Sequence, residues 1–451
     1  MHQKNSVPDD LLPGFSRSQL KIILDTAPVK QVIAAAGSGK TRTVIGLVTN
    51  RLLSGTDSEN SILMLSFSRK ASFELKERFP EAFREKLEIS TFHSFALRWI
   101  SKTHPEYSLK KIGIIKEKEK LSFFEKYLRK HSEIVGGIPF HLLMTDDGLF
   151  SDLFPDLYQK IHGDYADHKK KNDLLEYGDL VRIIVRDLIN HESYTDQFRN
   201  RYSLIVVDEF QDTDPEQLIF LEQMKCRELV VVGDDWQAIY AFRGASVEPF
   251  LHFKKKFQNA KLFYLSENYR SLPDIVSLGN HVIQFSEKQL KKRVRAMRRK
   301  KNRNTVMALS MHAGLEKTLH DVIPDKISYR ILTRSNRRRN DWINSGFQED
   351  FVMTIHKSKG LEFDCVLLDI TGGWSGYNPA VNAGGSNTND EEIRIAYVGL
   401  TRAKNKLIIL YDPEALPDRG QGALFENVFS SRVKRVSHDK IKQYLMKDII
   451  E

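Results

Sequence analysis

Short apolar runs that end in glycine or acidic residues recur along this chain of 451 residues. Residues 31–35, 204–207 and 229–232 are such runs, and their length and flanking residues predict buried strands. The pattern of 43–53 and of 117–131 instead predicts helices. In a parallel sheet the carboxyl ends of neighbouring strands meet at one crevice, so polar residues that follow these strands are expected to lie close together.

The first of these strands runs into AAAGSGKT, from Ala34 to Thr41, which has the form of a phosphate-binding loop. Gly37 and Gly39 allow backbone N–H groups to approach phosphate oxygens, and the next helix adds positive potential at its N-terminus. Lys40 is expected to reach the β- and γ-phosphates of ATP, and Thr41 to ligate Mg²⁺. Ala34 stands where the general pattern has its first glycine, so the match is incomplete, and a glycine-rich turn is the alternative.

Asp208 and Glu209 directly follow the second strand. Nucleotide hydrolysis needs a loop that holds phosphates and, separately, carboxylates at a strand end. Asp208 is expected to hold Mg²⁺, directly or through water, and Glu209 to polarise the attacking water. Gln237 follows the third strand, from which it could sense the γ-phosphate. An acidic turn is the alternative, but the upstream loop favours a nucleotide hydrolase.

Composition narrows the class of protein further. The formal charge of +10 suits a polyanionic partner, although many basic proteins bind none. The only cysteines are Cys226 and Cys365, which argues against a disulfide framework or a zinc cluster. No apolar run approaches 18 residues, and no cationic segment followed by an apolar core opens the chain, so we expect a cytoplasmic protein without a membrane partner.

A series of short motifs follows in a fixed order. They occupy residues 66–71, 90–94, 207–213, 232–245, 268–271, 353–363 and 396–404. This series resembles that of the UvrD/Rep-type superfamily 1 (SF1A) DNA helicases, and GDDWQAIY in the fourth motif is similar to the helicase IV branch in particular. The resemblance extends from Gln19 to about Leu410. It implies an α/β fold of two tandem RecA-like P-loop motor lobes with parallel sheets, plus a small helical insertion in the first lobe.

The motif order also implies domain boundaries. We expect the first lobe (1A, ATP-binding) at 1–97 and 173–262, the helical insertion (1B) at 98–172 and the second lobe (2A) at 263–451, beginning near the strand Lys261–Leu265. Family members usually carry a further helical insertion, the 2B subdomain, before the motif that begins near Phe351. Here a turn or short helix is all that fits between Asn336 and that motif.

The resemblance assigns roles to residues inside the motifs. Arg270 and Arg402 match two arginine fingers that would stabilise the transition state from the second lobe, with a surface ion pair as the alternative for each. Tyr269 and Arg42 are expected to sandwich adenine, and Glu362 to approach the ribose. The expected catalytic residues are Lys40, Asp208, Glu209, Gln237, Arg270 and Arg402. The expected ATP-binding residues are Gln19, Ala36, Gly37, Ser38, Gly39, Lys40, Thr41, Arg42, Tyr269, Gly360 and Glu362.

Gln19 has a second interpretation from the residues themselves. Ser16-Arg17-Ser18-Gln19 has the form of a capping box that starts a helix, in which Gln19 bonds back to the Ser16 N–H. The resemblance instead implies that Gln19 recognises adenine, and we favour that role.

Single-stranded DNA is expected on aromatic and polar residues of the motif loops, because bases stack on aromatic rings. The expected DNA-binding residues are Phe67, Thr91, Phe92, His93, Tyr240, Phe242, Arg243, Thr354 and His356. A core role is the alternative for each aromatic residue and stays open for Phe92. The basic run 288–303 predicts either a solvated helix or loop or an auxiliary nucleic-acid or partner surface. A basic helical tail is expected from Ser430 to Glu451.

These observations predict an ATP-dependent DNA motor with ATP and Mg²⁺ as cofactors and single-stranded DNA, on a 3′-tailed or forked duplex, as partner. Movement from 3′ to 5′ is implied by the resemblance alone. One alternative is a DNA-stimulated ATPase that needs a protein partner, such as a nuclease subunit of a repair or anti-phage complex. A nucleotide-locked DNA-binding scaffold is least favoured, because the expected catalytic residues are all present.

Overall fold

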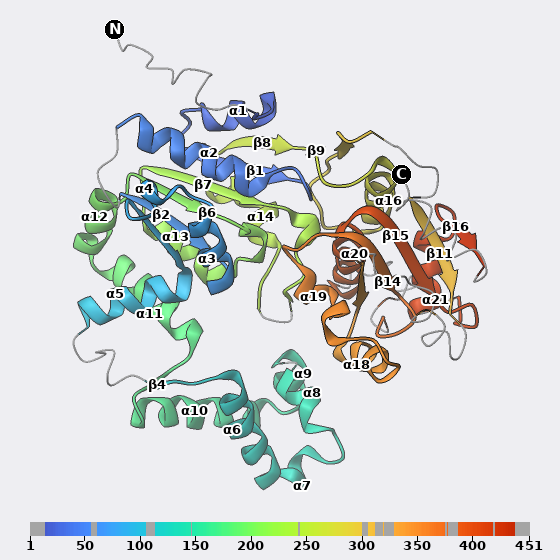
Figure 1. Ribbon diagram of the computed structural model, residues 1–451. Helices are drawn as coiled ribbons and strands as arrows, with labels where there is room; N and C mark the ends of the chain where they lie inside the picture. Colours follow the sequence, from blue (N-terminus) through green and yellow to red (C-terminus); the bar gives the residue numbers. More distant parts are fainter. Residues whose placement is uncertain are drawn as a thin grey trace. The chain divides into compact units, whose positions relative to one another are not determined.

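The computed structural model forms two compact units (Figure 1). The first comprises residues 1–89, 202–215 and 226–451, and the second comprises 90–201 and 216–225. The structure describes residues 14–55, 61–104, 113–145, 147–241, 244–299, 305–311, 319, 329–374, 377, 387–417 and 420–437.

The first of two large sheets has six strands in the order β3-β2-β6-β7-β1-β8. They are β1 (Val29–Ala34), β2 (Ile62–Ser66), β3 (Leu87–Thr91), β6 (Leu204–Val207), β7 (Glu228–Gly233) and β8 (Lys261–Leu265). The strands predicted from the three apolar runs are confirmed as β1, β6 and β7. Ile33 is paired with Gly233, and Val207 with Val231, in parallel register. The loops that follow these strands therefore leave the sheet at one edge.

Strand β8 corrects one expected boundary. We expected Lys261–Leu265 to open the second lobe, but β8 pairs with β1 as the last strand of the first sheet. Phe263 and Leu265 are buried in the same apolar cluster as Val32 of β1. The boundary at 262 was therefore wrong, because it cuts through a strand whose apolar residues complete the first core.

Helices cover the first sheet along its apolar residues. Helix α1 (Arg17–Ile23) and helix α2 (Lys40–Leu53) pack on β1 through the same buried cluster, and α3 (Arg69–Glu77) and α4 (Glu81–Arg84) follow β2. Helix α2 begins at Lys40, earlier than the predicted start at Thr43. The glycine loop thus leads directly into the helix N-terminus.

The second large sheet has the order β13-β12-β14-β15-β11-β16. Its strands are β11 (Val306–Ser310), β12 (Tyr329–Thr333), β13 (Val352–Thr354), β14 (Phe363–Asp369), β15 (Ala403–Tyr411) and β16 (Lys434–Val436). The recorded strand pairs in both large sheets are parallel, which confirms the α/β class. We expected a helical tail from Ser430 to Glu451, but residues 434–436 of it form strand β16. Residues 438–451 lie outside the described part.

The part of the chain after β8, which forms the second large sheet, also contains helices α16, α18, α19, α20 and α21. Their bounds are Pro273–Val282, Asn336–Asn344, Ile355–Ser358, Asn387–Leu400 and Gly420–Leu424. Between β12 and β13 the chain forms only α18 and a 3₁₀ turn at Glu349–Phe351. Because β12 and β13 are hydrogen-bonded neighbours, this segment is the short connection that the spacing predicted.

The second compact unit is mainly helical, and so is the described part of residues 98–172 within it. Residues 90–97, 173–201 and 216–225, which we expected in the first lobe, also belong to this unit. Its helices are α5 (Phe92–Thr103), α6 (Glu117–Lys130), α7 (Ser132–Val135), α8 (Phe140–Thr145), α9 (Asp147–Leu153), α10 (Pro155–Lys171), α11 (Tyr177–Asn190), α12 (Glu192–Arg201) and most of α13 (Pro215–Gln223). Phe124, Leu128, Ile161 and Tyr165 form part of a buried cluster there. Among the described residues, none of the helices has the length and apolar character needed to cross a membrane.

Candidate active site

The loop between β1 and α2 has the backbone that a phosphate cradle needs. Gly37 and Gly39 have φ of 68° and 81°, which side chains rarely adopt. Ala34, by contrast, is the buried last residue of β1, so its extended backbone accepts a methyl group at the position where a glycine was expected. The Ser38 hydroxyl is buried without a hydrogen-bond partner among the described residues. The loop and the N-terminus of the helix therefore have polar groups that can donate hydrogen bonds to an anion.

A cavity of about 670 Å³ lies over this loop, within the size range of small-molecule sites. It brings together most of the residues that the sequence predicted. Those that line it are Gly37, Ser38, Gly39, Lys40, Thr41, Arg42, Phe67, Asp208, Glu209, Gln237, Tyr240, Arg270, Gly360, Glu362 and Arg402. Gln19, Ala36 and Tyr269 are not in its lining. Residues next to strands of both large sheets, such as Asp208 after β6 and Arg402 before β15, therefore line the same cavity.

Two adjacent carboxylates at the end of β6 have opposite electrostatic environments. Burial and the neighbouring charge of Glu209 raise the pKa of Asp208. Burial acts in the same direction on Glu209, but Lys40 and Lys359 outweigh it and hold the pKa of Glu209 below its usual range. The Lys40 ammonium lies 3.4 Å from Oε1 of Glu209. Glu209 is therefore ionised. The environment disfavours the charged form of Asp208, and a cation nearby would stabilise that form.

Glu209 also has an unusual backbone. Its φ of 53° and ψ of 41° place a residue other than glycine in the left-handed region, and Asp208 Oδ1 accepts its N–H at 3.0 Å. Such conformations cost on the order of 1–3 kcal/mol and persist where the surrounding structure imposes them. The contacts of Glu209 with Lys40 and Gln211 are among those that can impose this conformation.

A continuous hydrogen-bond network runs from Glu209 to Arg402. Gln211 Nε2 donates to Glu209 Oε2 at 2.6 Å, and Gln211 Oε1 accepts the Asp234 N–H at 2.8 Å. Asp234 Oδ2 accepts from Gln237 Nε2 at 2.6 Å. Gln237 Oε1 in turn accepts from Arg402 Nη2 at 2.9 Å. Both ends of the Gln237 amide are therefore held by charged groups.

The two expected arginine fingers line the same cavity as Lys40. Arg402 is 1% exposed, and burial, together with the nearby Arg270 charge, lowers its pKa. Arg270 Nε donates to Glu362 Oε2 at 2.6 Å, and Arg270 Nη1 to the Thr401 carbonyl at 3.3 Å. Glu362, expected at the ribose, is thus paired with Arg270. Two guanidinium groups that repel each other beside a phosphate loop favour an anion between them.

The side chain of Gln19 is engaged in the capping box. Gln19 Oε1 accepts the Ser16 N–H at 2.9 Å, and the Gln19 N–H donates to Ser16 Oγ at 3.3 Å. Gln19 Nε2 donates to the Ser38 carbonyl at 3.1 Å. The cap that we did not favour is formed, and the same amide supports the phosphate loop; adenine recognition by Gln19 stays a prediction.

The residues expected around adenine, Tyr269 and Arg42, have the following surroundings. Tyr269 is 42% exposed, and its hydroxyl donates to Glu267 at 2.8 Å. The Arg42 guanidinium lies 4.8 Å from the centre of the Phe15 ring. The Ala36 carbonyl accepts from Asn268 Nδ2 at 2.8 Å, which ties the loop to the segment before Tyr269.

Four of the expected DNA-binding residues lie in the first unit. Phe67 and Tyr240 stack at 5.1 Å with 15° between their rings, and His356 lies 6.2 Å from Tyr240. His356 Nε2 is 3.1 Å from the Ile239 carbonyl. Thr354 is the N-cap of α19. Phe242 and Arg243 lie outside the described residues. The structure thus gathers three rings from separate motifs, with a face of Phe67 already used by Tyr240.

The other three belong to the second unit. Thr91 caps α5 through its hydroxyl, which accepts the Ser94 N–H at 3.1 Å. Phe92 is 4% exposed and meets Phe220 edge to face at 6.1 Å, so the core alternative is what the structure shows for this ring. Burial lowers the pKa of His93 and favours its neutral form.

Sequence reasoning missed the roles of Lys359, Asp212 and Asp234. Lys359 Nζ donates to Asp212 Oδ2 at 2.5 Å and to the Gln237 carbonyl at 2.8 Å. Asp234 is fully buried. All three lie inside the recognised motifs, which was a usable signal. Spacing alone, however, does not distinguish Lys359 from Lys357 in the same motif.

Comparison with known proteins decides the family. The model of the UvrD/REP helicase N-terminal domain matches residues 15–136 and 145–258, which is more than half of the chain. The chain belongs to the UvrD/REP helicase family. The model of the UvrD-like helicase C-terminal domain also matches, at residues 343–414. The two matches contain both the phosphate loop and Arg402.

Relatives within this family are similar over part of their length. The ATP-dependent DNA helicase PcrA of Bacillus subtilis (strain 168) is 28% identical over 299 residues, which are 62% of this chain and 40% of that protein. The probable DNA helicase II homolog of Mycoplasma capricolum is 29% identical over 303 residues, 61% of this chain and 41% of its own. The putative ATP-dependent DNA helicase YjcD of Bacillus subtilis is 28% identical over 311 residues, 63% and 40%. The chain thus matches about two fifths of these relatives.

Proposed function

We propose that this UvrD/REP family protein hydrolyses ATP, with Mg²⁺, to move along single-stranded DNA. The observation that carries the proposal is the network from Glu209 to Arg402 around a cavity that also contains Lys40. The relatives named above, which are described as DNA helicases, support it. A cytoplasmic location is part of the proposal.

Binding of the triphosphate follows from the loop. Backbone N–H groups beside Gly37 and Gly39 and the N-terminus of α2 attract phosphate oxygens, and Lys40 adds a full charge. Thr41 and Asp208 line the cavity together and fit Mg²⁺, which usually takes one or two protein ligands plus phosphates and water. When bound, Mg²⁺ supplies charge neutralisation at the phosphates.

Hydrolysis requires a base and compensation of developing charge. Glu209 is ionised, and Lys40 and Gln211 contact its carboxylate, so it can orient water and accept its proton, a contribution on the order of 10²–10⁴ in rate. Gln237 is held between Asp234 and Arg402 and can report the presence of the γ-phosphate. Arg270 and Arg402 stabilise negative charge at the transferred group.

Movement along DNA requires that these residues are coupled to the three neighbouring rings of Phe67, Tyr240 and His356. Lys359 Nζ lies 4.7 Å from the centre of the Tyr240 ring and contacts the Gln237 carbonyl, so a change at Gln237 reaches the expected base-stacking residues. We propose translocation from 3′ to 5′ on a 3′-tailed or forked duplex, by likeness to the UvrD/Rep family.

Steady-state ATP turnover tests the motor. We expect turnover to rise at least tenfold on addition of single-stranded DNA and to be abolished by Lys40→Ala or Glu209→Gln. Lys21→Ala and Glu192→Gln, at exposed positions on α1 and α12, are matched controls and should retain wild-type turnover. Equal turnover with and without DNA would contradict the proposal.

Strand displacement tests polarity and autonomy. Displacement from a 3′-tailed duplex, but not from a 5′-tailed one, is expected for the chain by itself. Displacement that occurs only after addition of a co-purifying protein would instead support the partner-dependent ATPase.

A further inference from the structure

The described part of the basic run, residues 288–299, forms no helix. Lys291, Arg293, Arg295 and Arg299 are exposed, as the solvated-loop alternative predicts, and the auxiliary-surface alternative stays open. One cation of the run differs from these. Residues 288–298, here called the basic strap, form no helix and include strand β10 (Arg295–Ala296), which pairs with β9 (Glu267–Asn268). Lys292 lies in the middle of the strap, and its side chain is 1% exposed. Residues 300–303 of the run lie outside the described part.

Lys292 is buried against two aspartates of the Gln237 loop. Its Nζ lies 2.8 Å from Asp234 Oδ1 and 2.5 Å from Asp235 Oδ1, and both carboxylates have 0% side-chain exposure. The ammonium also lies 4.3 Å from the centre of the Trp236 ring. Burial acts to lower the pKa of Lys292, but the two aspartates outweigh it and raise the pKa, so the ammonium stays charged. The Leu290 N–H adds a bond to Asp235 Oδ2 at 2.7 Å.

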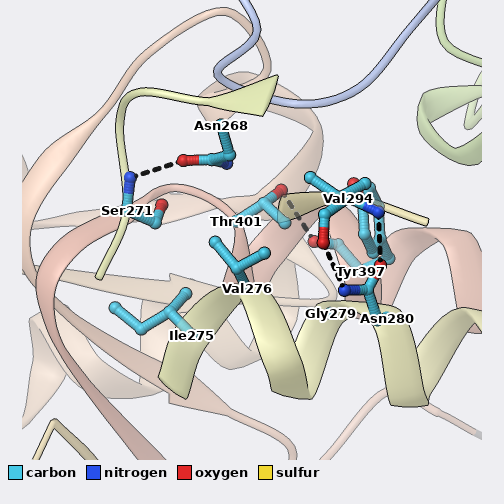
Figure 2. A pocket seen from close by; sticks show the side chains of 9 residues that line it. All are labelled: Asn268, Ser271, Ile275, Val276, Gly279, Asn280, Val294, Tyr397 and Thr401. Carbon is cyan, nitrogen blue, oxygen red and sulfur yellow. Dashed lines mark hydrogen bonds between the residues drawn. The ribbon is translucent and has the colours of Figure 1, made fainter. Parts of the chain in front are cut away.

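The strap is held in place beyond Lys292 as well. Asn280 of α16 forms two hydrogen bonds with the backbone of Val294 (Figure 2). Asn280 Nδ2 donates to the Val294 carbonyl at 2.8 Å, and Asn280 Oδ1 accepts the Val294 N–H at 3.1 Å. The Met297 N–H donates to the Asn268 carbonyl at 2.8 Å. Arg298 Nη1 donates to the carbonyl of Arg270 at 2.6 Å. The strap therefore links the loop that contains Gln237 to the segment that contains Arg270.

One carboxylate connects Lys292 to the reaction residues. Asp234 uses Oδ1 for Lys292 and Oδ2 for Gln237 Nε2, whose Oε1 partner is Arg402. Without Lys292, two buried carboxylates would face each other with no ammonium between them, and one would take a proton or rotate. Either change removes the fixed acceptor that orients the Gln237 amide.

We propose that Lys292 is a positioning residue for ATP hydrolysis, which acts through Asp234 on Gln237 and does not contact the nucleotide itself. The proposal rests on the proposed function. It assigns Lys292 to the hydrolysis step, so its loss should lower kcat and leave KM for ATP unchanged, since the phosphate loop and Lys40 are intact.

The test compares Lys292→Met and the double variant Asp235→Asn/Lys292→Met with wild type. The double variant leaves a single buried carboxylate, Asp234, and so avoids the charge repulsion that could unfold Lys292→Met. Lys291→Met, at the exposed neighbouring position, is the matched control and should behave as wild type. ATP turnover with saturating single-stranded DNA, KM for ATP and thermal unfolding are measured for each.

A folded double variant with kcat reduced tenfold or more and KM within threefold of wild type supports the proposal, since loss of one oriented polar group at a reaction centre has effects of this order or larger. A smaller fall in kcat overturns it. Unfolding of both variants, or a rise in KM that matches the fall in kcat, also overturns it, because Lys292 would then serve folding or binding. Absence of turnover in wild type would refute the proposed function instead.

Discussion

Arg402→Lys is a sharp test of the arginine that closes the network. The guanidinium of Arg402 donates from Nε to the Val398 carbonyl at 3.0 Å, from Nη1 to the Leu361 carbonyl at 3.2 Å and from Nη2 to Gln237 Oε1 at 2.9 Å. Lysine keeps the positive charge, but a single ammonium cannot reproduce this fork. The substitution therefore separates the geometry of Arg402 from its charge.

Two magnitudes follow from these contacts. The Val398 carbonyl keeps the Thr401 hydroxyl as a donor at 3.1 Å, but the Leu361 carbonyl and Gln237 Oε1 lose the guanidinium. A buried acceptor left without a donor costs about 1–3 kcal/mol, so we expect the free energy of unfolding to fall by about 2–4 kcal/mol. Arginine fingers contribute about 10³–10⁵ in kcat. Because lysine retains part of the electrostatic effect, we expect kcat to fall about 100- to 1,000-fold, equivalent to about 3–4 kcal/mol in the barrier.

The assay is ATP turnover with saturating single-stranded DNA, with KM and chemical unfolding measured on the same samples. Arg435→Lys is a matched control, since Arg435 forms a surface ion pair with Glu426 and its side chain is 53% exposed. A folded Arg402→Lys protein with kcat within fivefold of wild type would refute the finger role of Arg402.

Two further predictions concern the loop and the buried acids. Ala34→Gly restores the glycine of the general phosphate-loop pattern and should leave ATP turnover within twofold of wild type. Because Ala34 is a strand residue, the substitution should lower the free energy of unfolding by about 0.5–1 kcal/mol. Thermal unfolding measures this change, and a gain in stability would contradict the prediction. Burial raises the pKa of Asp212 from 3.8 to about 6 although Lys359 opposes it, so the native state binds more protons than the unfolded state between about pH 4 and 6. The free energy of unfolding of wild type should therefore fall, relative to that of Asp212→Asn, as pH rises through this window. Unfolding titrations of both proteins at several pH values measure the difference. Parallel pH profiles would exclude a raised pKa of Asp212.

Strand composition predicted the central strands well. Residues 204–207 are β6, and the runs near Gln31 and Leu229 are β1 and β7, because short apolar runs between turn residues have few other ways to be buried. Residues 261–265 were also recognised as a strand, but in the wrong place. Which sheet a strand joins depends on partners far away in the chain, and β8 alternates exposed and buried residues as an edge strand does.

Several site residues were assigned by motif but changed by their contacts. Glu362 is paired with Arg270, and Gln19 forms the cap that we had not favoured, while their roles at the ribose and at adenine stay predictions. Both outcomes depend on atoms that come together only after folding. A side chain with several possible partners takes the one that burial and geometry leave within hydrogen-bond distance.

The sequence by itself determined the parts of the site that are local. A glycine loop before a helix, two carboxylates after a strand and arginines within short motifs are each set by neighbours a few positions away. Only the tertiary structure decided what long-range burial does to charge: it made Lys292, one cation in a basic run, the buried partner of Asp234, and it separated the pKa values of Asp208 and Glu209. The physical reason is that the energy of a charge depends on its distance from other charges and from water, and neither distance is encoded in sequence spacing.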